Sequence, residues 1–191
     1  MHTLGAQRRS VLGGLGLIAL AALQPGGSAR AAAPASGTAP SDFDFLMGRW
    51  RVRHHRLKRR LAGDDHWEDF GGTSSVRKIL GGAGNMDENV IDLPAGRYEG
   101  ASFRLYDHAA QAWSIWWIDS RSPTLDPPVV GRFENGRGVF LADDTFEGRP
   151  IRVRYIWSEI TARTCHWEQA FSPDGEKTWE TNWRMQFDRE A

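Results

Sequence analysis

The chain has 191 residues, with 24 Lys and Arg against 24 Asp and Glu and a single cysteine. This length predicts one main domain, and one cysteine excludes an intramolecular disulfide. The balanced charge, without a broad basic face, argues against a nucleic-acid-binding protein.

The first 33 residues have the pattern of an export signal. They contain no acidic residue, and Arg8-Arg9 precedes an apolar run at 11–23. That run is too short to span a bilayer, which takes ~20 apolar residues, and Ala29-Arg30-Ala31 after it suits cleavage. The arginine pair resembles a twin-arginine signal, with an ordinary Sec signal as the alternative. We therefore expect a periplasmic or secreted protein that is not inserted stably in the membrane after cleavage.

Residues 34–41 are rich in Pro, Ala, Ser and Gly, which predicts a flexible linker before a folded domain at 42–191. Ser41 or Asp42 could cap a short helical turn that runs through Met47.

After this turn, apolar and polar residues alternate in short runs separated by turn residues, a pattern typical of β-strands. We expect ten strands, near residues 49–57, 66–79, 85–93, 98–106, 113–119, 129–134, 138–143, 151–157, 164–172 and 178–188. Sequential strands without crossover helices predict an all-β antiparallel meander that closes into a single up-and-down barrel. A two-sheet sandwich is the alternative.

Two dipeptides predict the register of their hairpins. Asn135-Gly136 and Asp174-Gly175 both suit two-residue loops, which need positive φ. In the second hairpin, such a loop would place His166 opposite Trp183 and Glu168 opposite Thr181. A bulge would shift these pairs by one residue.

Gly48-Arg49-Trp50 opens the first expected strand and resembles the Gly-x-Trp signature of lipocalins and other calycin barrels. In those proteins the Trp closes one end of the barrel. The resemblance therefore implies that Gly48 and Trp50 form the closed end. It also implies that Trp50 contacts an arginine from a late strand, for which Arg184 is the candidate.

The resemblance extends over residues 42–189 through three blocks, at 43–50, 125–133 and 167–183. These blocks are similar to an uncharacterised bacterial family, a domain of unknown function placed in the calycin superfamily. The resemblance implies a lipocalin-like barrel and brings no established catalytic residues.

Tryptophan is concentrated in the expected barrel, which contains all nine of the chain. Trp113 and Trp117 share one face of their strand, and Trp179 and Trp183 follow near the C-terminus. One interpretation is a Trp-lined pocket for a small apolar or aromatic molecule, which makes the protein a carrier or sensor. The alternative is that these rings fill the barrel, so that the protein has a structural or interaction role.

Two pairs of charged residues are candidates for chemistry inside the barrel. Alternation places His166 and Glu168 on one face of a strand, and Arg152 and Arg154 on one face of another. Glu168 and His166 could act as acid and base of an isomerase or hydrolase. Alternatively, an arginine pairs with Glu168 and the charged groups fix ligand polarity. We favour the ion pair and a binding protein, and the sequence leaves catalysis open.

No spacing of His, Cys or acidic residues predicts a metal site, and no cofactor is expected. Haem held through His54, His55 or His166 is one alternative. The basic run at 51–60 is typical of a solvated strand end and turn, and an acidic ligand there remains open. The oligomeric state is not specified by the sequence.

Overall fold

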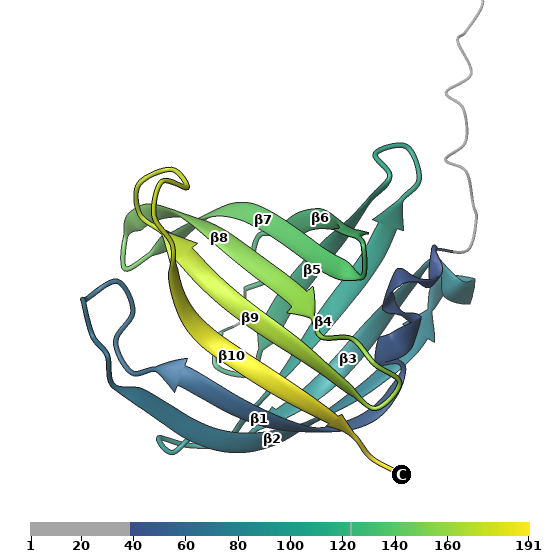
Figure 1. The fold of residues 1–191 in the computed structure, drawn as a ribbon, viewed down its shortest axis with the longest axis horizontal. Helices are drawn as coiled ribbons and strands as arrows, with labels where there is room; N and C mark the ends of the chain where they lie inside the picture. The colour runs from purple at the N-terminus through teal and green to yellow at the C-terminus, as the bar shows by residue number, and fades with distance from the viewer. Residues whose placement is uncertain (1–38, 123) are drawn as a thin grey trace, which may run out of the picture. The chain divides into compact units, whose positions relative to one another are not determined.

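The computed structural model describes residues 39–122 and 124–191, so the predicted export signal and most of the predicted linker lie outside these ranges. The described residues form a closed antiparallel barrel in the order β1-β10-β9-β8-β7-β6-β5-β4-β3-β2 (Figure 1). Each strand pairs with its neighbours in sequence, and pairing of β1 with β10 closes the ring. The expected all-β barrel is confirmed, and the sandwich alternative is wrong.

The strands are β1 (Gly48–Leu57), β2 (Trp67–Ile79), β3 (Gly84–Ile91), β4 (Tyr98–Asp107), β5 (Ala112–Asp119), β6 (Val129–Glu134), β7 (Arg137–Phe146), β8 (Arg149–Ser158), β9 (Thr164–Ser172) and β10 (Glu180–Arg189). Each overlaps the strand predicted for it. Two short 3₁₀ helices, η1 (Ser41–Leu46) and η2 (Leu80–Gly82), complete the described elements. None of the helices within the described ranges has the length and apolar character needed to span a membrane.

The β6–β7 hairpin has the two-residue loop that its sequence predicts. Asn135 and Gly136 have φ of +51° and +75°, and Glu134 pairs with Arg137. Both central residues of such a loop need positive φ, which Asn and Gly adopt readily.

The β9–β10 hairpin differs from the prediction, because its loop covers residues 173–179. Asp174 accepts hydrogen bonds from Ser172 Oγ and from Thr178, and these bonds hold the wider loop. The register then shifts between Thr181 and Trp183. The predicted pairing of this hairpin is therefore wrong.

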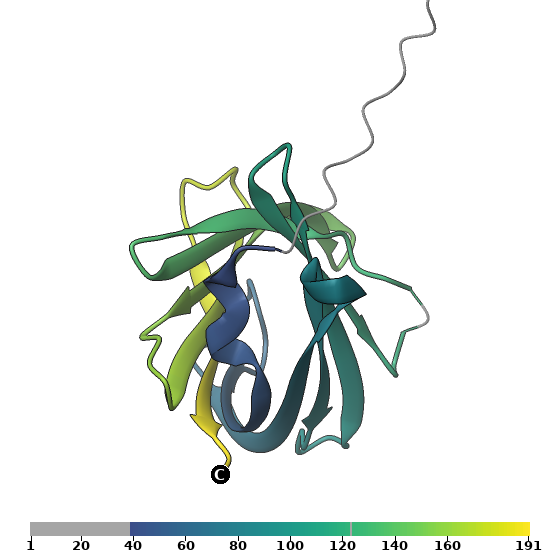
Figure 2. The ribbon, with the colours of Figure 1, turned by 90° about the vertical axis from the view of Figure 1, so that its right-hand side faces the viewer.

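Helix η1 lies across one end of the barrel (Figure 2). Its Phe43 is buried and meets the Trp113 ring edge-on, with ring centroids 5.0 Å apart. Trp113 Nε1 donates a hydrogen bond to Asp42 Oδ2 at 3.0 Å, which fastens η1 to β5. Because the Asp42 carboxylate binds this indole, it does not cap the helix, and the N-cap is Pro40 without a side-chain hydrogen bond. The predicted cap is wrong.

Trp50 is fully buried at the same end, as the Gly-x-Trp resemblance implies. Its Nε1 donates to Leu46 O at 2.7 Å, and the Arg189 guanidinium stacks over its ring at 4.2 Å. Arg189 also donates to backbone carbonyls within 45–47. Gly48 has φ +112°, and a Cβ there would lie 2.9 Å from Arg189 Nη1. Glycine is needed for both reasons.

Arg184, the predicted partner of Trp50, lies elsewhere. It stacks on Trp67 of β2 at 4.9 Å. Since Trp183 and Met185 line the interior, strand alternation turns Arg184 outward and Arg189 inward. The expected late-strand arginine is therefore Arg189.

The opposite end of the barrel carries the connections at 58–66, 92–97, 120–122 with 124–128, 147–148 and 173–179. Because the strands alternate in direction, every second connection reaches this end. We call it the open end, and the end with η1 the closed end.

Candidate ligand-binding cavity

A cavity of about 340 Å³ lies inside the barrel. Its aromatic lining consists of Trp117, Phe146, Tyr155, Trp157, Trp167, Phe171, Trp183 and Phe187, together with the imidazole of His54. The size and the aromatic walls are those of a small-molecule site. Four of the nine tryptophans, at 117, 157, 167 and 183, therefore surround a space rather than filling it.

The four tryptophans predicted to line the pocket divide into two pairs. Trp117 and Trp183 line the cavity. Trp113 belongs to the closed end, where it packs against η1. Trp179 lies in the 173–179 loop, stacked with Arg154 at 4.3 Å on the outer side of the barrel. The prediction that Trp113 and Trp179 line the pocket is therefore wrong.

The place of Trp117 depends on a glycine in the neighbouring strand. A Cβ at Gly100 of β4 would lie 2.4 Å from the Trp117 ring. Glycine lets the indole approach the backbone of β4 closely, and Trp117 Nε1 donates to Asp119 Oδ2 at 3.2 Å. A larger residue at position 100 would displace this wall of the cavity.

The charged residues predicted for the interior lie on the outer face of the barrel. In β8 and β9 the inward positions belong to Val153, Tyr155, Trp157, Trp167, Gln169 and Phe171. Alternation therefore turns Arg152, Arg154, His166 and Glu168 outward. Their predicted contact with a ligand inside the barrel is wrong.

The predicted ion pair of Glu168 with an arginine of β8 is also wrong. Arg152 pairs with Asp143 at 3.1 Å and with Glu176 at 2.8 Å. Glu168 lies opposite Arg184 on β10 and forms no ion pair with any described residue. An acid–base pair of His166 and Glu168 therefore has no access to the cavity.

Of the three histidines considered for haem, His54 lines the cavity. Its ring stacks on Phe70 with centroids 4.7 Å apart, and its Nδ1 accepts a hydrogen bond from Trp183 Nε1 at 3.2 Å. Burial, and then the charge of Arg56, lower the His54 pKa to about 4. This imidazole is neutral at physiological pH, whereas His55 pairs with the exposed Asp69 on the outer face.

Toward the closed end, the cavity wall contains a buried ion pair that sequence reasoning missed. Asp87 binds Arg104 and also accepts from Ser102 N at 2.8 Å, and Arg104 Nη1 donates to Asn85 Oδ1 at 3.0 Å. Arg104 Nε and Trp157 Nε1 are buried donors that have no hydrogen-bond acceptor among the described residues. The polar residues at 85, 87 and 89 alternate as they would on a solvent-facing side of β3. The sequence pattern therefore did not indicate that these side chains lie inside the barrel.

Toward the open end, further charged residues line the cavity, among them Arg60, Asp119, Arg121, Asp126 and Asp144. Arg121 pairs with Asp119 at 2.6 Å, and this hydrogen bond lowers the Asp119 pKa. Burial, followed by the charges of Asp144 and Asp119, raises the pKa of Asp126. One side of the opening is therefore acidic.

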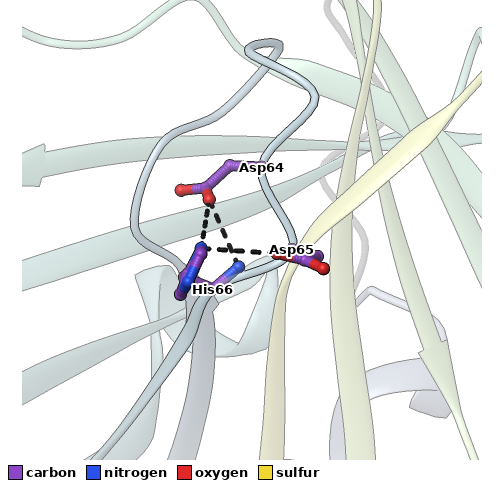
Figure 3. Close-up of side chains that lie close together, drawn as sticks. All are labelled: Asp64, Asp65 and His66. Atoms are coloured by element: carbon purple, nitrogen blue, oxygen red, sulfur yellow. Dashed lines mark hydrogen bonds and ion pairs between the residues drawn. The ribbon is translucent and has the colours of Figure 1, made fainter.

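A small cluster of Asp64, Asp65 and His66 lies in the 58–66 loop (Figure 3). His66 Nδ1 is 2.7 Å from Asp64 Oδ1, and Arg59 also binds Asp64. The hydrogen bond from His66 is the main reason why the Asp64 pKa falls to about 2. These bonds hold the loop together, and they account for the close approach of the three side chains.

No protein-family model matches this chain, and no curated protein matches it. Among solved structures, the S-type phycobiliprotein lyase CPES from Guillardia theta is similar. The two chains share 10% identity with a TM-score of 0.52, over 78% of this chain and 90% of the lyase. At this identity the likeness establishes a common fold alone. The barrel has a calycin-like fold, as the Gly-x-Trp resemblance implied.

Proposed function

We propose that this protein is a carrier or sensor that binds a small apolar or aromatic molecule inside its barrel. The observation that supports this proposal is the cavity of about 340 Å³, walled by Trp117, Trp157, Trp167 and Trp183. Flat rings on several sides favour a flat, apolar ligand, because burial and ring stacking both contribute to its affinity.

Polar groups within the same walls would orient such a ligand. Gln169 donates to Asn182 Oδ1 at 2.9 Å, and His54 accepts from Trp183. A mostly apolar pocket with a few placed polar groups is typical of a ligand site, because those groups fix the orientation of the ligand.

The proposal includes export to the periplasm or the cell exterior by the twin-arginine route, and membership of the bacterial calycin family named above. Both rest on sequence: the signal on residues 1–33, and the family on the blocks within 42–189. The folded barrel without disulfides suits this route, since its single Cys165 is buried and unpaired.

Calorimetric titration with naphthylethanol, a neutral two-ring aromatic alcohol, tests binding in the cavity. The wild type should bind it with one site per chain. Ile115→Trp should abolish binding, because Ile115 lines the cavity and the larger ring occupies the space of the ligand. Ser114→Trp is the matched control, since Ser114 is the adjacent residue on the other face of β5. Equal binding by both variants, or no binding by the wild type, would contradict the proposal.

A further inference from the structure

The basic run at 51–60 reaches the open end of the barrel. Its last residue, Arg60, lies in the 58–66 loop and lines the cavity. Arg60 also lines a second pocket of about 610 Å³, which contains three further basic residues, Lys58, Arg59 and Arg149, against one acidic residue, Glu147. The opening is therefore basic on the side of this loop.

The guanidinium of Arg60 lies against two rings rather than a carboxylate. Its Cζ is 4.9 Å from the Phe146 ring centroid and 5.7 Å from that of Phe171. Among the described residues it forms no ion pair. Cation–π contacts hold the group in place without neutralising its charge.

Two other cations act on Arg60 by their charge, and both already have a carboxylate partner. Arg56 pairs with Glu68 at 2.8 Å, and Arg121 pairs with Asp119 at 2.6 Å. Burial, followed by the charges of Arg56 and Arg121, lowers the pKa of Arg60. A half-buried cation beside two others is stabilised by any anion that reaches it.

The loop that carries Arg60 is fixed before a ligand arrives. Leu61 N donates to Glu180 Oε1 at 2.7 Å, which ties the loop to β10. The hydrogen bond of Asp64 with His66 (Figure 3) and that of Asp64 with Arg59 hold its other half. A preorganised guanidinium loses little freedom on binding an anion.

We infer that the ligand of this barrel is an amphipathic anion. Its aromatic or apolar body would lie among the tryptophans, and a single carboxylate or similar anionic group would bind Arg60 at the open end. Asp126 and Asp144 line another part of the cavity and disfavour a second negative charge. This inference rests on the proposed function and adds the charge of the ligand to it.

The test compares three probes of similar shape by calorimetry: naphthylacetate, neutral naphthylethanol and cationic naphthylethylamine. The wild type should bind the acetate most tightly, by on the order of tenfold over the alcohol, because a charge-assisted hydrogen bond is added. Arg60→Gln should remove this preference and leave binding of the alcohol unchanged, whereas Arg60→Lys should keep part of it.

Arg53→Gln is the matched control, because Arg53 belongs to the same basic run, is exposed, lines neither pocket and pairs with Asp188 at 3.1 Å. It should leave all three affinities as they are, and thermal denaturation should show that each variant is folded. Tightest binding of the amine, or an equal loss for all probes in Arg60→Gln, would overturn the inference. If the alcohol binds and Ile115→Trp blocks it, but the acetate has no advantage, the inference fails while the proposed function stands. If no probe binds, both fail.

Discussion

The two ends of the barrel differ in their side chains: the closed end is aromatic and buried, and the open end is charged. At the closed end, Phe43, Trp50 and Trp113 are buried to about 1% exposure or less, and both indole N–H groups donate hydrogen bonds to η1. At the open end, Arg60 and Arg121 lie in loops, and Arg60 forms no ion pair with any described residue.

This difference separates stability from recognition. Aromatic rings in close edge-on packing gain most from burial, so the closed end holds the ring of strands together. Charged groups that the protein leaves unpaired gain most from a ligand, so the open end can discriminate among ligands. Substitutions at the two ends should therefore have different consequences.

The largest effect is expected from Trp50→Ala. This change removes a fully buried indole and its hydrogen bond to Leu46 O. Such truncations cost ~3–5 kcal/mol. The urea midpoint at pH 7 should fall accordingly.

Trp67→Ala is the matched control at the open end. Trp67 is half-buried on the outer face, between His55 and Arg184. Its removal should cost about 1 kcal/mol, as is usual for partly exposed side chains. Equal midpoints for the two variants would mean that the closed end has no special role in stability.

The acid response of His54 gives the next largest effect. Its pKa of about 4 in the folded protein lies below the usual 6.5, so the unfolded chain takes up the proton first. The neutral imidazole therefore adds ~3 kcal/mol to the free energy of unfolding above pH 6.5, and this contribution is lost as the pH falls toward 4.

The measurement is the loss of unfolding free energy between pH 7 and pH 4.5. His54→Gln keeps a hydrogen-bond acceptor for Trp183 and should lose much less stability than the wild type over this range. His166→Gln, on the outer face of β9, should keep the wild-type response. If His54→Gln and the wild type lose the same amount, buried His54 is not the origin of the acid sensitivity.

The smallest change in stability is expected from a substitution in β9, between the two ends of the barrel. Glu168 faces outward and forms no ion pair with a described residue, so Glu168→Gln should change stability by no more than ~0.5 kcal/mol. The buried ion pair predicted from the sequence would have required a loss of ~3 kcal/mol or more. Urea denaturation of the two proteins at pH 7 distinguishes these cases.

The fold could be predicted from sequence because its signals are local. Alternation along each strand and the turn residues between strands place all ten strands. Asn135-Gly136 also fixes one register, since a two-residue loop leaves a single choice. The contact that closes the barrel was predicted in part. The Gly-x-Trp signature identified Gly48 and Trp50, but no sequence signal distinguished Arg189 from the other arginines near the C-terminus.

The site was predicted less well, because alternation shows which residues share a face but not which face is inside. In β9 the prediction relied on a two-residue loop at Asp174-Gly175, and the wider loop and the irregularity after Thr181 reversed the result. Trp167 and Phe171 at odd positions were the better signal for the inner face. The ion pair of Asp87 with Arg104 joins two strands, and nothing local in either one indicates it.

The pairing of β1 with β10 makes the first and last strands of the barrel neighbours. Arg189 reaches the carbonyl of Met47, 142 residues earlier in the chain. The ring therefore cannot close during synthesis until its last strand has left the ribosome, and contacts so distant in sequence slow folding. Until then the edges of β1 and of the latest strand are open to other chains. The nascent barrel thus depends on β10, and a chain truncated before Glu180 would keep both edges.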